Sequence, residues 1–172
     1  MPGLNRERVD PADFRDAMAR FPTGVAVVTA RDEAGEPHGM TVSSFCSVSL
    51  EPPLVLVCLA RTARSFPVFA RRPRFAVSVL RDHHAALAVR FARRGADKFT
   101  GGGLRVTPSG AVVVEDALAV LECAADGTHD GGDHLILVGR VERLALAAQP
   151  GPPAVYFDRA FGTVARSTGS AP

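Results

Sequence analysis

Gly39-Met40-Thr41-Val42-Ser43-Ser44-Phe45 is a hydroxyl-rich stretch that separates two runs of strand-forming residues. Residues 25–30 precede it as a β-branched run, and residues 54–59 follow it as a continuous apolar run. Both compositions are typical of buried strands. Hydroxyl side chains beside a glycine provide hydrogen-bond donors and a backbone that a ligand can approach closely. The stretch therefore predicts either a ligand-contacting turn between strands or an ordinary exposed loop.

The segments before this stretch predict a helix followed by a hairpin. Residues 10–13 read Asp-Pro-Ala-Asp, which combines an N-cap, a proline at the first helical position and an acid in the first turn. Phe14, Met18 and Phe21 then recur at helical spacing, so we expect a first helix that packs one face on the core. Residues 38–42 are expected to return as the hairpin partner of residues 25–30.

The segments after this stretch predict more strands and two short helices. Strand composition recurs at residues 45–50, 54–59, 75–80, 117–125, 134–146 and 155–157. Ser65 is expected to cap a short helix over residues 66–71, and residues 83–94 have helical composition. Residues 97–103 are expected to be flexible and exposed, and residues 126–133 are almost all turn formers and predict a loop.

Six or more strands at hairpin spacing, with only two or three short helices, predict a mainly β protein whose antiparallel sheet closes or nearly closes into a barrel. Strands do not alternate with helices, and no glycine-rich strand-to-helix turn occurs, so a Rossmann dinucleotide site is not expected. A length of 172 residues, 47% of them hydrophobic, suits a single domain over residues 1–172. We expect its core at about residues 14–161 and a disordered tail at residues 167–172.

Composition narrows the range of partners. The net charge of +2 is too balanced to favour nucleic acid, and no apolar run approaches the roughly 20 residues that span a bilayer. The charged residues 5–8 do not fit a signal peptide. Cys46, Cys58 and Cys123 lack metal spacing and each sit in an apolar run, so we expect buried small hydrophobes. The sequence predicts a cytoplasmic protein with no nucleic-acid or membrane partner.

Other motifs do not indicate a site. His83 and His84 are adjacent on a predicted helix and face apart, which is unsuitable for a metal pair. Residues 126–133 are rich in acids and glycine but lack the spacing of a calcium loop. Ser43 and Ser44 have no Gly-x-Ser-x-Gly setting, so hydrolase chemistry is not indicated.

Five short motifs occur in order: Phe21-Pro22-Thr23-Gly24-Val25, residues 39–45, Ser47-Val48-Ser49-Leu50-Glu51-Pro52-Pro53-Leu54, Asp97-Lys98-Phe99 and Gly132-Asp133-His134. In this order and at these spacings the chain resembles the flavin reductase-like family, the small reductase components of two-component flavin monooxygenases. The likeness extends from about residue 14 to residue 161. It implies a split β-barrel of Greek-key type that binds FMN or FAD, usually as a homodimer. It also implies oxidation of NADH or NADPH and delivery of reduced flavin to a separate oxygenase.

The resemblance implies which residues bind the flavin. A flavin phosphate needs cations and hydroxyl or amide donors, and the ring needs an apolar wall. Ser65 and Lys98, the only lysine of the chain, are expected at the phosphate, although for Ser65 a plain N-cap remains as good an interpretation. Arg61 and Arg64 could add positive charge near the phosphate, but a solvated surface arginine is the better interpretation of each. The full expected set is Thr41, Val42, Ser43, Ser44, Cys58, Leu59, Ala60, Ser65, Lys98, Phe99, Tyr156 and Arg159.

His134 is the residue expected to handle the nicotinamide, with Thr23 and Gly24 on the same face of the flavin ring. Hydride transfer needs no general base, so the alignment of two rings is the main requirement. A histidine that only satisfies loop backbone is the alternative for His134.

The predicted function is therefore an NAD(P)H-dependent flavin reductase that supplies a partner monooxygenase. Two alternatives stay open. An FMN-holding reductase on the same fold would act directly on a quinone-like or other organic acceptor in a biosynthetic pathway. A non-catalytic flavin-binding protein would only carry electrons.

Overall fold

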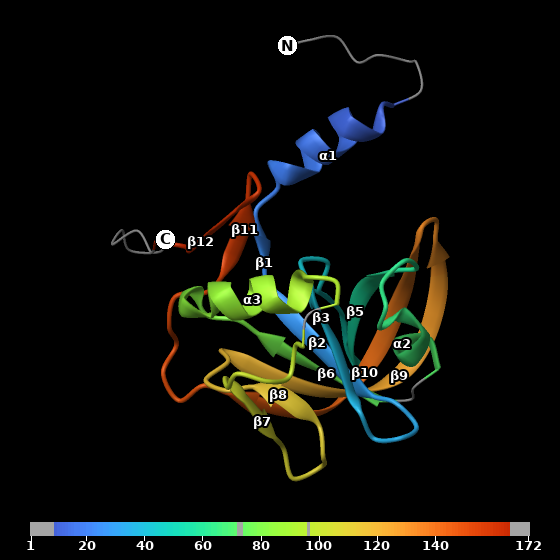
Figure 1. The fold of residues 1–172 in the computed structure, drawn as a ribbon, viewed down its shortest axis with the longest axis vertical. Helices are drawn as coiled ribbons and strands as arrows, with labels where there is room; N and C mark the ends of the chain where they lie inside the picture. Colours follow the sequence, from blue (N-terminus) through green and yellow to red (C-terminus); the bar gives the residue numbers. More distant parts are fainter. Residues whose placement is uncertain (1–8, 72–73, 96, 166–172) are drawn as a thin grey trace.

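A seven-stranded antiparallel sheet forms the centre of the molecule in a computed structural model that describes residues 9–71, 74–95 and 97–165 (Figure 1). Its strand order is β3-β2-β6-β9-β10-β5-β4. In chain order these strands are β2 (Ala26–Arg31), β3 (Pro37–Val42), β4 (Cys46–Leu50), β5 (Pro53–Ala60), β6 (Arg74–Val79), β9 (Ala119–Gly131) and β10 (His134–Leu146).

The sheet curls round on itself. Strands β3 and β4 form its two edges, yet only residues 43–45 connect them. A connection of this length spans at most about 14 Å, so the two edges must lie close together. Ser44 reinforces the closure, because its hydroxyl accepts from Cys58 N at 3.0 Å and donates to Cys58 O at 3.2 Å on β5. The predicted mainly β, barrel-like fold is confirmed.

Smaller elements surround the large sheet. A three-stranded sheet has the order β1-β11-β12, with β1 (Thr23–Gly24), β11 (Val155–Phe157) and β12 (Ala160–Gly162). A hairpin pairs β7 (Leu104–Val106) with β8 (Val112–Val114). The helices are α1 (Pro11–Ala19), α2 (Phe66–Arg71) and α3 (Ala85–Ala92), preceded by the 3-10 turn η1 (Asp82–His84). In the described residues no helix is both long and apolar enough to cross a membrane.

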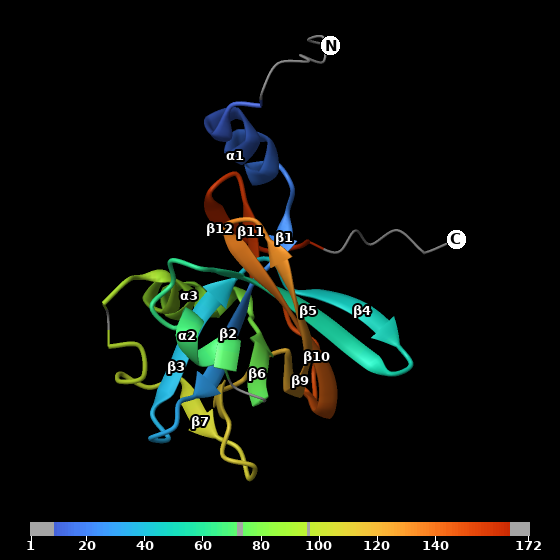
Figure 2. The ribbon, with the colours of Figure 1, turned by 90° about the vertical axis from the view of Figure 1, so that its right-hand side faces the viewer.

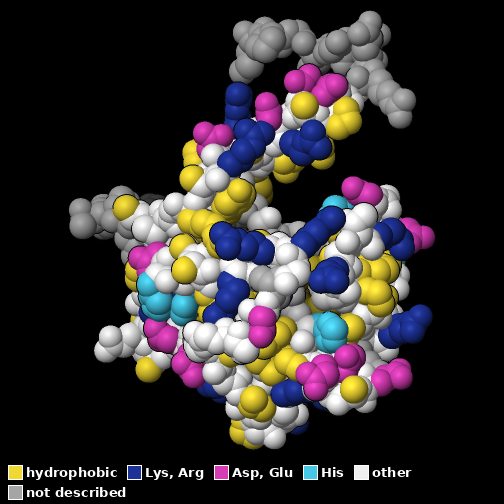
Figure 3. All heavy atoms as spheres, in the orientation of Figure 1, with side chains coloured by type: hydrophobic (Ala, Val, Ile, Leu, Met, Phe, Trp, Pro, Cys, Tyr) yellow, Lys and Arg dark blue, Asp and Glu magenta, His cyan; other side chains and the backbone are white. Residues whose placement is uncertain are grey.

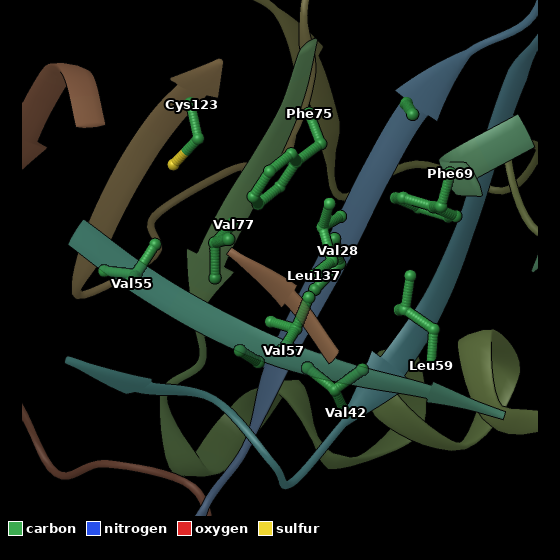
Figure 4. Packing of buried hydrophobic residues seen from close by; sticks show 12 residues of the cluster. Val28, Val42, Val55, Val57, Leu59, Phe69, Phe75, Val77, Cys123 and Leu137 are labelled. Atoms are coloured by element: carbon green, nitrogen blue, oxygen red, sulfur yellow. The ribbon is translucent and has the colours of Figure 1, made fainter. Parts of the chain in front are cut away.

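Strands β2 and β6 are buried on both faces, each face by a different cluster. Val28 of β2 and Val77 of β6 point inward with Phe69 of α2, and the side chains in Figure 4 converge on this inner core. Their strand neighbours Val27 and Ala76 point outward to the cluster under α3 and the β7–β8 hairpin. The alternation of side chains along a strand explains why such runs are apolar throughout.

The predicted loop at residues 126–133 is mostly strand. Strand β9 continues to Gly131 and pairs with β10 from Gly131 opposite His134 onward, so that only Gly132 and Asp133 form the turn. Gly132 has a φ of 71°, a conformation that glycine adopts without strain. Pairing with β10, which is itself held by β5, outweighs the turn-forming composition.

Helix α1 forms where predicted but does not pack on the core. Asp10 caps it by accepting from Ala12 N at 2.6 Å, yet no residue of the helix is buried. Phe14 is 58% exposed and Met18 is 50% exposed. The helix projects beyond β11 and β12 in both views (Figures 1 and 2). The expectation of a core-facing helix was wrong because α1 is held at the β11–β12 turn instead, where Asp158 N donates to Ala19 O at 2.7 Å and Arg159 pairs with Asp16.

The cysteines differ from one another, contrary to the expectation that all three are buried. Cys46 is exposed on the edge strand β4 and Cys58 is half-buried. Cys123 alone is buried, and desolvation raises the pKa of its thiol to about 12. The predicted tail at residues 167–172 lies outside the described residues.

Candidate active site

A cavity of about 650 Å³ opens between strand β3, the loop after β5 and the C-terminal end of α3. We call it the β3–α3 cavity. Of the predicted flavin residues it brings together Thr41, Ala60, Ser65, Lys98 and Phe99. Lysine and arginine side chains gather around the hollow between α3 and α2 (Figure 3). Residues that are distant in the sequence therefore share one site.

A second cavity of about 370 Å³ continues from the first towards β11. Thr41, Ala92 and Arg93 line both cavities. The second cavity, called here the α3–β11 cavity, adds Tyr156 and Phe161, whose rings meet edge to face at 5.2 Å. One end of the combined site is cationic, and the other is aromatic.

Two residues of the opening stretch bring β3 and α3 together. Gly39 is buried against the helix, and a Cβ there would lie 2.8 Å from Phe91 Cε1, so no larger residue fits without displacing α3. The Thr41 hydroxyl donates to Ala88 O at 2.6 Å. This bond ties the strand to the helix and leaves the hydroxyl oxygen to accept a hydrogen bond from a ligand.

Lys98 is anchored, although its segment was expected to be flexible. Its Nζ donates to Gly39 O at 3.0 Å and to Phe91 O at 2.7 Å. The Phe99 ring meets the Phe91 ring edge-on at 5.3 Å. Burial lowers the pKa of Lys98 because desolvation disfavours the charged ammonium. The two carbonyls use two of the three ammonium protons, which leaves one for a ligand in the cavity.

Several other donors face the β3–α3 cavity. Arg64, Arg93 and Arg94 line it, and none of them pairs with a carboxylate among the residues that the structure describes. Ser65 is buried; its backbone carbonyl accepts from Val68 N and Phe69 N, and its hydroxyl makes no hydrogen bond in this part of the structure. Such a donor set suits an anion such as a phosphate.

His38 also lines this cavity and was not predicted from the sequence. Its Nε2 donates to Asp32 Oδ2 at 2.9 Å, and this hydrogen bond lowers the pKa of Asp32. Arg93 and Arg94 were missed as well. The available signals were the position of His38 beside Gly39 and the pair of arginines that closes a helix, but both patterns are common on solvated surfaces.

Four predicted residues contribute mainly to the framework. Val42 and Leu59 point into the inner core, so only their backbones are available to a ligand. Ser44 and Cys58 bond to each other at the closure of the sheet. Ser43, by contrast, is exposed and lines the α3–β11 cavity.

His134 stands beside the β3–α3 cavity rather than in its wall. It lies opposite Ala60 in the β10–β5 pairing, and Ala60 lines the cavity. Its Nδ1 lies 2.7 Å from Asp133 Oδ1, and this hydrogen bond lowers the pKa of Asp133. An ionised carboxylate only accepts, so Nδ1 carries the proton and Nε2 is available as an acceptor.

The remaining predicted residues lie near β11. Thr23 pairs with Tyr156 across β1 and β11, which places it behind the aromatic cavity. Arg159 lines neither cavity. It is exposed in the turn between β11 and β12 and pairs with Asp16 of α1, which raises the pKa of Arg159. The structure therefore separates Arg159 from the site.

Comparisons with known proteins agree on one family. The flavin reductase like domain matches residues 18–165. A protein of Streptomyces coelicolor called actinorhodin polyketide dimerase is 55% identical, over 95% of this chain and 92% of that protein. The reductase subunit HsaB of a flavin-dependent monooxygenase from Rhodococcus jostii is 37% identical, over 96% of this chain and 85% of that protein.

A solved structure extends this agreement to the fold. The NADH:FAD oxidoreductase SgcE6 of Streptomyces globisporus, in complex with NAD and FAD fragments, superposes with a TM-score of 0.85. It is 37% identical over 95% of this chain and 99% of that one. The chain described here belongs to the flavin reductase-like family.

Proposed function

We propose that this protein is an NAD(P)H:flavin oxidoreductase that reduces FMN or FAD and supplies the reduced flavin to a partner monooxygenase. The observation that carries the proposal is the junction of a cationic cavity with an aromatic one at Thr41. A flavin nucleotide joins an anionic phosphate to a flat apolar ring, and the donor set of the combined site fits both parts.

The residues of the site take separate tasks in this proposal. Lys98 and Ser65 bind the flavin phosphate, and Arg64, Arg93 and Arg94 add positive charge around it. Phe99 and Tyr156 supply apolar walls. A bound flavin supplies the ring that accepts the hydride.

His134 orients the hydride donor. Its free Nε2 accepts a hydrogen bond from the nicotinamide carboxamide, while Asp133 fixes the tautomer and the plane of the imidazole. No side chain has to remove a proton in this step, so positioning carries the catalysis.

The working molecule is proposed to be a homodimer of single-domain chains in the cytoplasm. Exposed apolar side chains support the association: Phe14 and Met18 on α1, Leu50 on β4, and Leu144 and Leu146 on β10. Phe14 and Met18 are four residues apart and therefore share one face of α1, and an apolar face that a single chain leaves exposed is typical of a protein interface. The free thiols of all three cysteines suit a reducing compartment.

Steady-state oxidation of NADH and NADPH, measured with FMN, FAD and riboflavin as acceptors, tests the proposal. We expect turnover that depends on added flavin. Folded protein that oxidises neither nicotinamide with any flavin would contradict the activity, and a yellow protein of this kind would be an electron carrier instead.

A direct reductase of an organic acceptor is the second candidate. The aromatic α3–β11 cavity and the relative named as a polyketide dimerase favour it. Flavin that stays bound through gel filtration, together with reduction of an aromatic quinone in the absence of an oxygenase, would support this function over delivery of free flavin.

A further inference from the structure

Arg90 in the last turn of α3 holds the loop that carries Lys98, although it lines neither cavity. Its Nη1 donates to Thr100 O at 2.8 Å and its Nη2 donates to Gly102 O at 2.9 Å. Its Cζ lies 5.8 Å from the centre of the Phe91 ring. The guanidinium thus bridges the helix and the loop.

The burial of Arg90 Nε is unfavourable by itself. Arg90 Nε is a donor that is shielded from solvent and has no hydrogen-bond partner, and no other solvent-shielded side-chain nitrogen or oxygen atom among the described residues lacks one. The described residues provide no carboxylate that pairs with Arg90 either. Because an apolar side chain would pack on Phe91 without an unpaired donor, the two bonds to the loop are what the arginine adds.

The loop needs an external restraint. Gly101, Gly102 and Gly103 have φ angles of 90°, 81° and 80°, and glycine runs have high conformational freedom. At the near end of the loop, Asp97 Oδ1 accepts from the backbone of Phe99 and Thr100 at 3.3 Å. At the far end, Glu115 N donates to Gly103 O at 3.0 Å, and the bonds from Arg90 fix Thr100 and Gly102 between these two points.

We propose that Arg90 is a positioning residue for flavin phosphate binding and that it acts through Lys98. Lys98 Nζ donates to Phe91 O, the carbonyl of the residue next to Arg90. Arg90 and Lys98 therefore fasten the two sides of one loop to the same helix end. With the bonds to Thr100 and Gly102 in place, the ammonium stays in the cavity wall. This inference rests on the proposed flavin reductase function and deepens it.

A double-mutant cycle in the full chain tests the coupling. The wild type, Arg90→Ala, Lys98→Ala and the double variant are compared for the KM of FMN and of riboflavin at saturating NADH. We expect Arg90→Ala to raise the KM for FMN roughly tenfold and to change the KM for riboflavin and kcat by less than about twofold. The double variant should match Lys98→Ala within about twofold, because no ammonium is left to position.

Two further variants separate positioning from general stability. Arg90→Lys offers one ammonium for two carbonyls, so its KM for FMN should lie between those of the wild type and Arg90→Ala. Arg105→Ala is the control, because Arg105 is exposed on β7 just beyond the loop and should leave both KM values unchanged. Amide exchange should become faster in residues 97–104 of Arg90→Ala and Arg90→Lys and stay unchanged in β9 and β10.

Three results would overturn the inference. The increases in the KM for FMN could be additive in the double variant, Arg90→Ala could raise the KM for FMN and for riboflavin equally, or amide exchange in residues 97–104 could stay unchanged. The exchange measurement needs no turnover. If the wild type reduces no flavin, the proposed function fails, and amide exchange still decides whether Arg90 restrains the loop.

Discussion

The Lys98 ammonium joins the elements that form the β3–α3 cavity. It bonds a carbonyl of β3 at Gly39 and a carbonyl near the end of α3 at Phe91. A cation at a helix C-terminus is favourable for the helix dipole, so Lys98 has a structural role even without a ligand. The phosphate role therefore has to be tested against this background.

Lys98→Ala should weaken FMN binding about tenfold and riboflavin binding much less, because riboflavin lacks the phosphate. Flavin fluorescence titration measures both dissociation constants. Arg71→Ala is a matched control, since it removes one positive charge from α2 outside the cavity. Equal losses for the two flavins would leave Lys98 with its structural role alone.

His134 and Asp133 form a pair at the turn between β9 and β10. Because their hydrogen bond lowers the pKa of Asp133, the carboxylate stays ionised until the pH falls below the ordinary range of an aspartate. The orientation of the imidazole should therefore persist through neutral and mildly acidic pH, where the carboxylate is present to accept.

His134→Ala should raise the KM for NADH about tenfold and leave flavin affinity nearly unchanged. Asp133→Asn should act in the same direction more weakly, since an amide orients the imidazole less firmly. His83→Ala is the control, because His83 also lies near aspartates, Asp82 and Asp116, but outside both cavities. Loss of flavin binding in His134→Ala would place the histidine on the other ligand.

At the scale of elements, helix α1 is the part of the fold that the single chain leaves uncovered. Its apolar residues Phe14 and Met18 are 58% and 50% exposed, and Phe21 just beyond the helix is 63% exposed. Periodicity predicts an apolar face, but it does not say which molecule covers that face. A second copy of the chain is the proposed cover.

Replacement of Phe14 and Met18 together by serine should convert the proposed dimer to a monomer, because each change removes apolar contact area from the interface. Size-exclusion chromatography with light scattering reports the mass directly. Ala12→Ser, on the opposite face of the same helix, should leave the mass unchanged. A double variant that keeps the wild-type dimer mass would show that α1 is not part of the contact.

At the scale of the whole molecule, the closure of the sheet depends on close approaches between strands. Register shifts interrupt the β9–β10 ladder between Val138 and Gly139 and between Val141 and Arg143. Irregularities of this kind increase local twist and bend a sheet. At Gly139 the absence of a side chain leaves room for the Phe75 ring, which belongs to the inner core.

Gly139→Ala should lower the free energy of unfolding by about 1–3 kcal/mol, because a Cβ there would lie 2.7 Å from Phe75 Cε1 and would force the core to shift. Urea unfolding measures the change. Gly162→Ala is the control, since a Cβ at that position has no heavy atom within 4 Å. Equal free energies of unfolding for the two variants would mean that the core around Phe75 accommodates the added methyl group without strain.

The positions of most strands along the chain and the N-cap of α1 followed from local sequence. Residues 25–30 form a buried strand, residues 54–59 form a strand that is buried on one face, Asp10 caps α1, and Thr41, Ser65 and Lys98 line one cavity. These predictions succeed because side-chain periodicity, capping and motif chemistry are properties of neighbouring residues.

The tertiary structure alone decided which groups face one another. It extended β9 through residues 126–131, whose composition is typical of a loop, and it left α1 exposed. It also placed His38 in the wall of the β3–α3 cavity and Arg90 against the loop that carries Lys98. The sequence does not predict these contacts, because a histidine or an arginine is usually a solvated surface side chain and nothing in its local sequence identifies its partners. Those partners come from distant segments, and only the curled sheet brings them within hydrogen-bond distance.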